Sequence, residues 1–502
     1  MFSLVLVGTL GAWLGFANPV LQFPLAALAF PLALTWIGLR AISLKQAFKF
    51  GWFAGLLAGI GCYYWMVIPV QTYGGLPWFI ALPCPVVLAA AMGIYYGLFS
   101  VAMYQAGQKL EGIPLCLLAG LTWASLEMLM GWLFSGFPWT NLASAFAPWP
   151  FAIQGAALLG AYGLSGVLTM LAVAALLFST YRSTLYLSIS LSIGICAFGV
   201  LRISHFNGPK ASYPISIIQG NIDQGAKWDP EYQAATVKKY ATLTLQAISH
   251  FHPKVVIWPE TAMPFYFQDK TPYKKAVQIL AKDSRTPIIT GSPAYKVIDA
   301  KARKYVLYNR AWLVDDTGRA LQRYDKEHLV PFGEYMPFEE WIPFKKLVQA
   351  AGDFVPGDNN QPIIIDGVAL GMLICYEGIF PELAQQQVER GASVILNISN
   401  DAWFGETSAP NQHLNLTILR AVEQGRWLVR STNTGISAFV DPLGRITAMS
   451  TQFKAEHLNA FVAPINDTTP FHRNYDLIAR SIYALTVAMY GLFVFGARRK
   501  EQ

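Results

Sequence analysis

Three reactive side chains lie at turns, and two of them come directly after an apolar run of the kind that forms a buried strand. Cys375 ends the run 370–374. Glu260 follows the run 255–258 after one proline, and Lys326 lies among acidic residues ahead of a loop rich in Pro and Gly. A thiol at a strand-to-helix turn suits a nucleophile, and a carboxylate at the rim of a sheet suits a general base. Together the three residues predict an enzyme site, although the cysteine alone fits a structural thiol equally well, and a lone Lys or Glu is usually a solvated surface group.

Cys375 differs from the other cysteines in its surroundings. Four thiols lie in long apolar runs, where a thiol acts as a small hydrophobe: Cys62, Cys84, Cys116 and Cys196. A helical pattern begins near Pro381, and a helix N-terminus at this turn predicts a pKa of the Cys375 thiol below about 8.5. The seven histidines show no tight ligand spacing, so we expect neither a metal nor a cofactor. His328, close to Lys326, leaves a Cys-His mechanism open.

The elements that must position these residues follow an α/β pattern. From Tyr213 onward, short continuous apolar runs alternate with helical ones, which predicts sheets covered by helices. The expected strands are 214–219, 254–258, 287–291, 308–314, 362–365, 369–375, 393–398 and 436–440. The expected helices are 231–250, 273–281, 381–390 and 415–427. Asp366-Gly367, between two apolar runs, predicts a hairpin turn.

The first 201 residues have a different composition. Of the 37 Lys and Arg and the 30 Asp and Glu of the chain, only five and two lie there, so this part is expected to face lipid. Apolar runs near 20 residues predict about eight spans, at 2–17, 21–39, 51–70, 78–106, 112–134, 150–179, 184–201 and 478–497. The spacing of Gly51, Gly55 and Gly59 predicts close packing between two helices.

The basic residues of the short connections predict an orientation, because such residues are retained on the cytoplasmic side. One side carries Arg40, Lys45, Lys49, Lys109, Arg182, Arg498, Arg499 and Lys500, and the short loops of the other side carry none. With both termini cytoplasmic, we expect a membrane domain at 1–204, an extracytoplasmic domain at 205–472, and a last helix with a cytoplasmic tail at 473–502. The only block of Lys and Arg is at 498–500, so nucleic acid is not an expected partner.

Two further features admit two interpretations each. Glu127 lies inside a span, where a central charge costs at least about 2.5 kcal/mol, so it either contacts a substrate head group or bonds within the helical bundle. The aromatic and basic stretch 336–348 is either an interfacial arm that admits lipid or a buried core segment. Trp403 and Phe404 admit the same two interpretations.

The turns at Glu260, Lys326 and Cys375 resemble those of the nitrilase superfamily, whose Glu-Lys-Cys constellation is carried on a four-layer αββα sandwich. Over essentially the whole chain, longer motifs and the eight-span plan resemble the bacterial apolipoprotein N-acyltransferase family. The motifs are Gln219-Gly-Asn221, Lys227-Trp228, Ile257-Trp-Pro-Glu260, Asp325 to Glu334, Ile374-Cys-Tyr-Glu377, Asn397 to Gly405 and Gly136-Phe-Pro-Trp139.

The resemblance implies a two-step acyl transfer at a catalytic triad. Glu260 would take the proton of Cys375, whose thiolate attacks a phospholipid ester and forms a thioester acyl-enzyme. Lys326 would stabilise the oxyanion with a backbone N–H near Tyr376. Glu260 would then deprotonate the amine of a diacylglyceryl-modified cysteine, which collects the acyl group as an amide.

The resemblance also implies supporting roles and substrates. Glu334 would orient Lys326, Tyr376 and Glu377 would shape the pocket, and Trp228 would line the substrate path. The implied partners are a phospholipid donor, expected to be phosphatidylethanolamine, and a diacylated apolipoprotein acceptor. The implied location is the bacterial inner membrane with a periplasmic catalytic domain, and a monomer is sufficient. A membrane-tethered nitrilase-type amidase and a transporter with an extracytoplasmic binding domain remain as alternatives.

Overall fold

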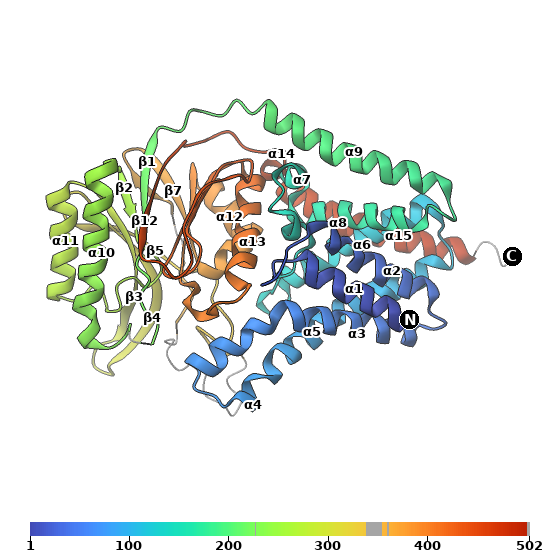
Figure 1. The fold of residues 1–502 in the computed structure, drawn as a ribbon, viewed down its shortest axis with the longest axis horizontal. Coiled ribbons are helices and arrows are strands. Elements are labelled where there is room, and N and C mark those ends of the chain that lie inside the picture. Colours follow the sequence, from blue (N-terminus) through green and yellow to red (C-terminus); the bar gives the residue numbers. More distant parts are fainter. Residues whose placement is uncertain (226, 338–353, 359–360, 499–502) are drawn as a thin grey trace.

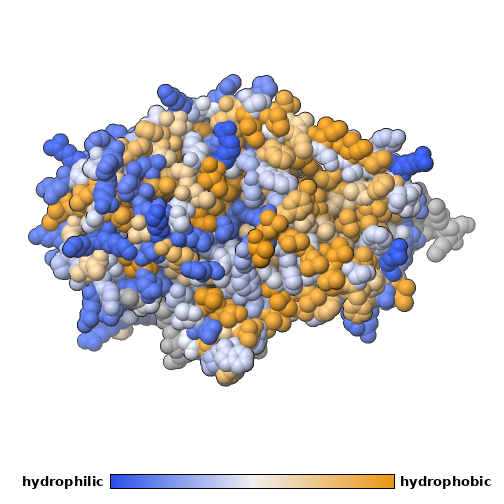
Figure 2. All heavy atoms as spheres, viewed as in Figure 1, coloured by the Kyte–Doolittle hydropathy of each residue, from blue (hydrophilic) through white to orange (hydrophobic). Residues whose placement is uncertain are grey.

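The computed structural model describes residues 1–225, 227–337, 354–358 and 361–498, and they form a helical half and a half built on two β-sheets (Figure 1). The helical half comprises helices α1 to α9 and the last helix, α15. Hydrophobic side chains gather over the helical half and hydrophilic ones over the far end of the sheet half (Figure 2). The charge segregation along the sequence is therefore also a division in space.

The helical half contains an apolar helix at each of the eight predicted spans. Its helices are Phe2–Gly15 (α1), Ala29–Arg40 (α2), Leu44–Tyr63 (α3), Trp78–Ala81 (α4), Pro83–Gly107 (α5), Gly112–Trp132 (α6), Pro150–Ile153 (α7), Ala156–Leu177 (α8), Arg182–Ser204 (α9) and Tyr475–Arg498 (α15). Within the described residues, six helical segments are long and apolar enough to cross a membrane, and two shorter apolar ones are Phe2–Gly15 and Pro24–Arg40. The two N-terminal runs thus form shorter helices than the rest.

Helix α3 packs closely on α5 through its glycines. A Cβ atom added at Gly51 would lie 2.4 Å from Ser100 Oγ, and one at Gly55 would lie 2.6 Å from the ring of Tyr96. Gly59 faces the same helix at a similar distance. Side chains do not tolerate such approaches, so the glycines allow the two backbones to meet. The predicted close packing is confirmed.

Two six-stranded sheets form the other half, in the orders β12-β1-β2-β3-β4-β5 and β11-β10-β9-β8-β7-β6. The first contains Tyr213–Gln219 (β1), Val255–Ile257 (β2), Ile288–Asp299 (β3), Lys304–Val314 (β4), Ala320–Asp325 (β5) and Glu456–Val462 (β12). The second contains Ile363–Ile365 (β6), Val368–Ile374 (β7), Val394–Ser399 (β8), Trp427–Thr432 (β9), Ala438–Val440 (β10) and Ile446–Met449 (β11). All eight predicted strands are present, and the predicted hairpin at Asp366-Gly367 joins β6 to β7. Strands β5, β9, β11 and β12 were not predicted.

The two sheets face each other across an apolar core that contains Ile217 and Ile289 of the first sheet and Met372 and Leu396 of the second. Helices α10 (Pro230–Phe251) and α11 (Pro272–Ser284) cover the first sheet, and α12 (Pro381–Glu389) and α13 (Ala409–Gln424) cover the second (Figure 1). Burial of each large aliphatic side chain contributes about 1.5–3 kcal/mol, which stabilises the stack of layers. The expected four-layer αββα sandwich is confirmed.

The layer of α12 and α13 also packs against the helical half, and the two share one apolar cluster. Gln412 of α13 is buried at this boundary. Its Nε2 donates to the backbone carbonyls of Ala17 at 2.9 Å and Cys62 at 3.2 Å. Its Oε1 accepts from the indole N–H groups of Trp65 at 3.1 Å and Trp139 at 2.7 Å. One side chain of the sandwich thus satisfies four polar groups of the helical half.

Candidate active site

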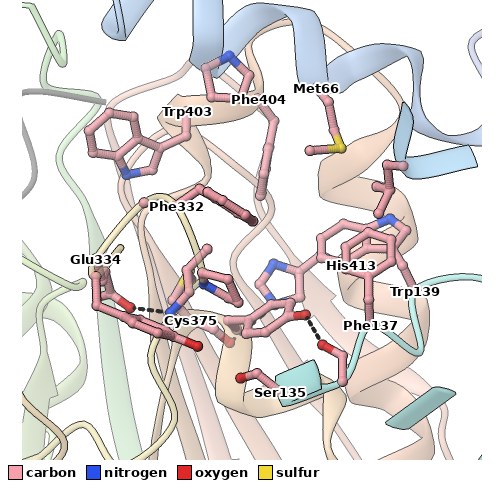
Figure 3. Close-up of a pocket in the computed structure, with 18 of the residues that line it drawn as sticks. Met66, Ser135, Phe137, Trp139, Phe332, Glu334, Cys375, Trp403, Phe404 and His413 are labelled. Carbon is pink, nitrogen blue, oxygen red and sulfur yellow. Dashed lines mark hydrogen bonds between the residues drawn. The ribbon is translucent and has the colours of Figure 1, made fainter. Parts of the chain in front are cut away.

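Glu260, Lys326 and Cys375 lie just beyond the ends of β2, β5 and β7, and all three line one cavity. Cys375 has a φ of +53°, a left-handed conformation that is rare outside Gly and costs roughly 1–2 kcal/mol. It opens the short 3-10 turn Cys375–Ile379. The sharp change of direction turns the sulfur away from the strand, and Figure 3 shows it in the cavity beside Glu334.

The carboxylates and the ammonium form a buried cluster. Lys326 Nζ lies 2.8 Å from Glu334 Oε2 and 3.9 Å from Glu260 Oε1. Asn309 of β4 bridges the two carboxylates, because its Nδ2 donates to Glu260 Oε1 at 2.7 Å and to Glu334 Oε1 at 2.8 Å. The backbone N–H of Val330 donates to Glu334 Oε2 at 2.8 Å. Among the described residues, no donor reaches Glu260 Oε2, so this oxygen can accept a proton.

Burial and mutual charge set the proton affinities of the cluster. Burial raises the pKa of Glu260 above its ordinary value, Lys326 opposes that rise, and Glu334 adds to it. Burial alone would lower the pKa of Lys326, but Glu334 and Glu260 together raise it above the ordinary value. Lys326 is therefore a fixed positive charge, and Glu260 is a stronger base than an exposed carboxylate.

The thiol differs from the sequence-based expectation. Burial raises the pKa of Cys375, the charge of Glu260 raises it further, and Lys326 lowers it. The predicted pKa below about 8.5 was wrong, because the Cys375 residue is only 9% exposed and burial disfavours the charged thiolate. The resting nucleophile is a thiol, so it needs a base to accept its proton when it attacks.

Glu377 holds two of these turns together. Its carboxylate accepts from the backbone N–H groups of Ile374 at 2.6 Å, Glu327 at 2.6 Å and His328 at 3.0 Å, and from the Tyr324 hydroxyl at 3.0 Å. Burial raises its pKa to about 7. It was expected to shape the pocket, but it is fully buried beneath the turns and is absent from the lining of the cavity within the described part of the chain. It fixes the residues beside Lys326 and Cys375 instead.

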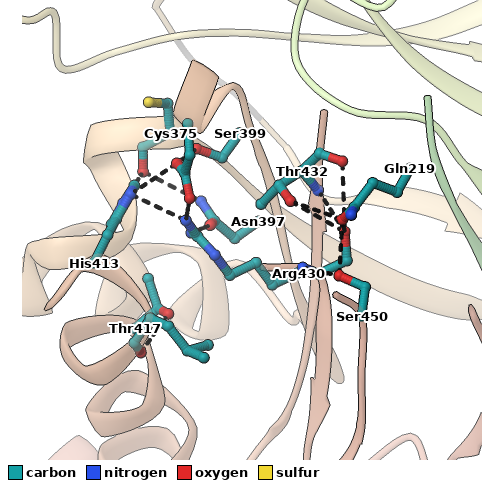
Figure 4. A network of polar contacts seen from close by, with 12 residues as sticks. Gln219, Cys375, Asn397, Ser399, His413, Thr417, Arg430, Thr432 and Ser450 are labelled. Carbon is teal, nitrogen blue, oxygen red and sulfur yellow. Dashed lines mark hydrogen bonds and ion pairs between the residues drawn. The ribbon is translucent and has the colours of Figure 1, made fainter. Parts of the chain in front are cut away.

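A second buried polar network lies under the nucleophile (Figure 4). Asn397 Nδ2 donates to the Cys375 carbonyl at 3.3 Å, and His413 Nε2 lies 3.2 Å from the same oxygen. Arg430 is paired with Asp401 at 2.8 Å, and His413 Nδ1 lies 3.0 Å from Arg430 and 3.2 Å from Asp401. A carbonyl oxygen only accepts, so His413 Nε2 carries a proton and donates it to the Cys375 carbonyl. The network holds the backbone of Cys375 in its turn. In the sequence, only the motif Asn397 to Gly405 indicated part of this network, since it contains Asn397 and Asp401.

The cavity has a volume of about 760 Å³ and joins the helical half to the sheet half. Its walls are largely apolar and aromatic, and Figure 3 shows Trp403, Phe404, Phe137 and Trp139 around it. The helical half contributes Trp65, Met66, Pro69, Val70, Cys84, Leu88, Ala91, Met92 and Tyr95. A chamber of this size and character can hold a fatty chain with its reactive end at the polar cluster.

Tyr376 and Trp228 lie where the sequence places them, on the cavity wall. Trp228 is 37% exposed and lies in the segment between β1 and α10. The segment 338–348 of the expected interfacial arm lies outside the described residues. Trp403 and Phe404 line the cavity, so neither is an ordinary core residue.

The loop after α6 carries part of the wall and touches the catalytic turns. Three successive residues, Phe134, Ser135 and Gly136, have positive φ angles of 54°, 72° and 75°. The Tyr376 hydroxyl donates to the Gly136 carbonyl at 2.8 Å, and His328 Nε2 lies 2.8 Å from the Ser135 carbonyl. His328 is thus engaged by the loop, and a Cys-His pair has no support.

Glu127 holds the far end of the same loop. Its Oε1 accepts from Trp123 Nε1 at 2.9 Å and from the backbone N–H of Leu142 at 2.7 Å, and its Oε2 accepts from Asn141 Nδ2. It is 3% exposed and lies away from the cavity lining. Of the two interpretations, the bonded glutamate holds and the head-group contact does not.

Sequence comparisons agree with this architecture. The family model described as carbon-nitrogen hydrolase matches residues 215–464, and that of the apolipoprotein N-acyltransferase N-terminal domain matches residues 9–174. Among solved structures, a carbon-nitrogen hydrolase from Helicobacter pylori G27 aligns at a TM-score of 0.38 and 18% identity, covering 54% of this chain and 94% of that chain.

Full-length relatives match both halves at once. The apolipoprotein N-acyltransferase of Geobacter metallireducens is 37% identical over 481 residues, which cover 91% of this chain and 90% of that protein. The apolipoprotein N-acyltransferase of Pseudomonas putida is 32% identical over 462 residues, which cover 89% of this chain and 88% of that protein. Because the similarity runs through the helical half, the sandwich and the site between them, the chain belongs to the apolipoprotein N-acyltransferase family.

Proposed function

We propose that the protein transfers a fatty acyl group from a membrane phospholipid to the N-terminal amine of a diacylglyceryl-modified apolipoprotein. Cys375 holds the acyl group as a thioester between the two steps. The observation that carries the proposal is the cavity, whose apolar wall comes partly from helices long and apolar enough to cross a membrane and whose polar end contains Cys375, Glu260 and Lys326.

In the first step, the Cys375 sulfur attacks the carbonyl carbon of a phospholipid ester while Glu260 accepts the thiol proton. The free Oε2 of Glu260 supports this role, because its other oxygen is already held by Asn309. Lys326 and a backbone N–H near Tyr376 stabilise the oxyanion. The tetrahedral intermediate collapses by breaking the C–O bond, and the lysophospholipid alkoxide leaves with the proton from Glu260.

In the second step, the acceptor amine attacks the thioester carbonyl, and Glu260 takes a proton from the nitrogen. The C–S bond breaks, an amide forms, and the Cys375 sulfur takes the proton back from Glu260, which restores the thiol. An amide is more stable than a thioester, so this step runs downhill. Glu334 keeps Lys326 directed at the reacting carbonyl, as their 2.8 Å contact supports, and Trp228 lines the substrate path.

The membrane setting follows from the substrates, since both are anchored in a bilayer by acyl chains. The chain is a membrane protein, and we propose the bacterial inner membrane, with both termini cytoplasmic and the domain 205–472 in the periplasm. The proposed flanking parts are a membrane domain at 1–204 and a last helix with its tail at 473–502. The proposed donor is phosphatidylethanolamine, and a monomer suffices for the mechanism because the three triad residues of one chain line the same cavity.

Intact-mass measurement of the purified protein with phospholipid tests the first step. We expect a fatty-acyl increment on Cys375 that is absent from Cys375→Ser, Glu260→Gln and Lys326→Ala, each still folded in detergent. Cys196→Ser is the control, because Cys196 is an exposed thiol of α9 that is not among the described residues lining the cavity, so this variant should leave the increment unchanged. Acylation at another residue, or full acylation of Glu260→Gln, would refute the triad.

The fate of the acyl-enzyme tests the second step and separates the two candidate enzymes. An acyl transferase discharges the thioester rapidly to a diacylated lipopeptide amine and slowly to water. A membrane-tethered amidase uses water equally well, so rapid loss of the increment without an amine would favour that alternative. Replacing phosphatidylethanolamine with another phospholipid in the same assay tests the donor.

A further inference from the structure

One face of α5 forms a continuous wall of the cavity that holds the triad. Its lining residues recur at the spacing of a single helix face, and they are Cys84, Leu88, Ala91, Met92 and Tyr95. Helix α4 and the start of α5 lie at the end of the helical half that faces the sandwich, and α5 continues away from it (Figure 1). The wall therefore leads from the polar end of the cavity into the bundle.

Tyr95 closes this wall at its far end. It is 7% exposed, and it is the last residue along α5 among the described residues that line the cavity. One turn further, Phe99 is fully buried, and its ring centroid lies 5.1 Å from that of Trp123 of α6. Trp123 also packs against the rings of Phe30 and Tyr96. The packed bundle begins where the cavity ends, and Tyr95 forms the floor between them.

The wall has the length of one fatty chain in one leaflet of a bilayer. Cys84 and Tyr95 are eleven residues apart, which corresponds to about 16 Å along a helix. A hydrocarbon core of about 30 Å holds two leaflets, so a chain in one of them spans about 15 Å. Tyr95 also lies near the middle of the apolar span Trp78–Gly107. The floor is thus at the depth where the terminal methyl group of such a chain lies.

We propose that Tyr95 is a specificity-determining residue that limits the length of the fatty chain transferred. The inference rests on the proposed acyl transfer and deepens it, because the chain measured is the one carried by Cys375. The thioester carbonyl must lie at Glu260 and Lys326, which fixes one end of the chain, and Tyr95 blocks the other end. A chain too long for the wall leaves its last methylenes unburied, and each buried methylene is worth about fourfold in binding.

The test supplies the full chain, in detergent, with an equimolar mixture of dimyristoyl and distearoyl phosphatidylethanolamine. These donors differ only in chain length, and intact mass gives the ratio of stearoyl to myristoyl thioester on Cys375 at early times. Competing donors are discriminated by their kcat/KM values, so the ratio does not depend on the total activity of a variant. Tyr95→Ala opens the floor and should raise the ratio at least about fourfold above the wild type. Tyr95→Leu should shift it in the same direction if Tyr95→Ala does not fold.

Ala91→Phe tests the same wall in the opposite direction. It adds a ring one turn before the floor and shortens the space for the chain, so the ratio should fall at least about fourfold. The matched controls are Ile94→Ala and Val87→Phe, which change side-chain volume on the exposed side of α5. Ile94 and Val87 are 47% and 67% exposed and are not among the described residues that line the cavity. Both controls should keep the wild-type ratio.

The inference is overturned if both Tyr95 variants are acylated with the wild-type ratio, or if Val87→Phe lowers the ratio as much as Ala91→Phe. A purely structural role of Tyr95 would slow both donors equally and leave the ratio unchanged, so that result also counts against it. Failure of the proposed function gives a different result. If the wild-type chain forms no thioester on Cys375 with either donor, the acyl transfer itself is wrong. If the thioester forms and only the ratios fail to move, the role of Tyr95 alone is wrong.

Discussion

Asn309 offers a test of how far the buried hydrogen bonds control the reaction. One amide nitrogen donates to Glu260 at 2.7 Å and to Glu334 at 2.8 Å, and thus holds two like charges side by side. Asn309→Ala removes both bonds. A hydrogen bond to a charged group contributes about 1.5–3 kcal/mol, so losing the one that orients Glu260 should slow acylation of Cys375 roughly 10- to 150-fold.

The assay is the rate of appearance of the acyl increment on Cys375, measured by intact mass in phospholipid micelles. Tyr308→Phe is the control, because it changes the adjacent residue of the same strand without touching either carboxylate. Asn309→Asp keeps the shape but adds a carboxylate, so it should be at least as slow as Asn309→Ala. An Asn309→Ala rate within about threefold of the wild type, in a protein that unfolds at the same temperature, would refute the reasoning.

Two other residues give predictions that thermal or chemical unfolding in detergent can check. Glu127→Ala should destabilise the protein by roughly 3–5 kcal/mol, because it leaves three buried donors unpaired, whereas Glu127→Gln keeps one acceptor and should cost less; equal unfolding temperatures for the two variants would contradict this. For Glu377, whose pKa in the folded chain is raised from 4.5 to about 7, the folded state binds more protons than the unfolded state between these values. Its contribution to stability should therefore fall as pH rises from about 4.5 to 7, and Glu377→Gln should flatten that part of the curve; an unchanged slope would show that Glu377 does not titrate in this range.

The sequence revealed the site's main turns because each has a strong local marker. Trp258-Pro259-Glu260 ends an apolar run with a proline, and the run before Cys375 stops at a turn. Asn309 had no such marker, since it lies within a strand and its partners come from segments 49 and 25 residues away. A polar residue in a strand has the same local pattern whether it faces water or two carboxylates.

The wrong expectation for the Cys375 pKa and the missed strands also have physical causes. A helix start can be recognised locally, but the burial that raises the thiol pKa depends on the surrounding fold. The helix expected to reach Trp427 ends at Gln424, because Gly425 adopts a φ of +63° and the chain then enters β9. Strand β12 is only half-buried at the edge of its sheet, so it lacks the continuous apolar run that marked the central strands.

Gln412 limits how this protein can be recombined with its relatives. Its amide meets groups from three separate parts of the helical half, near Ala17, near Cys62 and Trp65, and at Trp139. A chimera that grafts the membrane part of one relative onto the sandwich of another must reproduce all four of these partners at once, or bury them without bonds. An exchange that removes any one of these partners should therefore destabilise the boundary between the two halves.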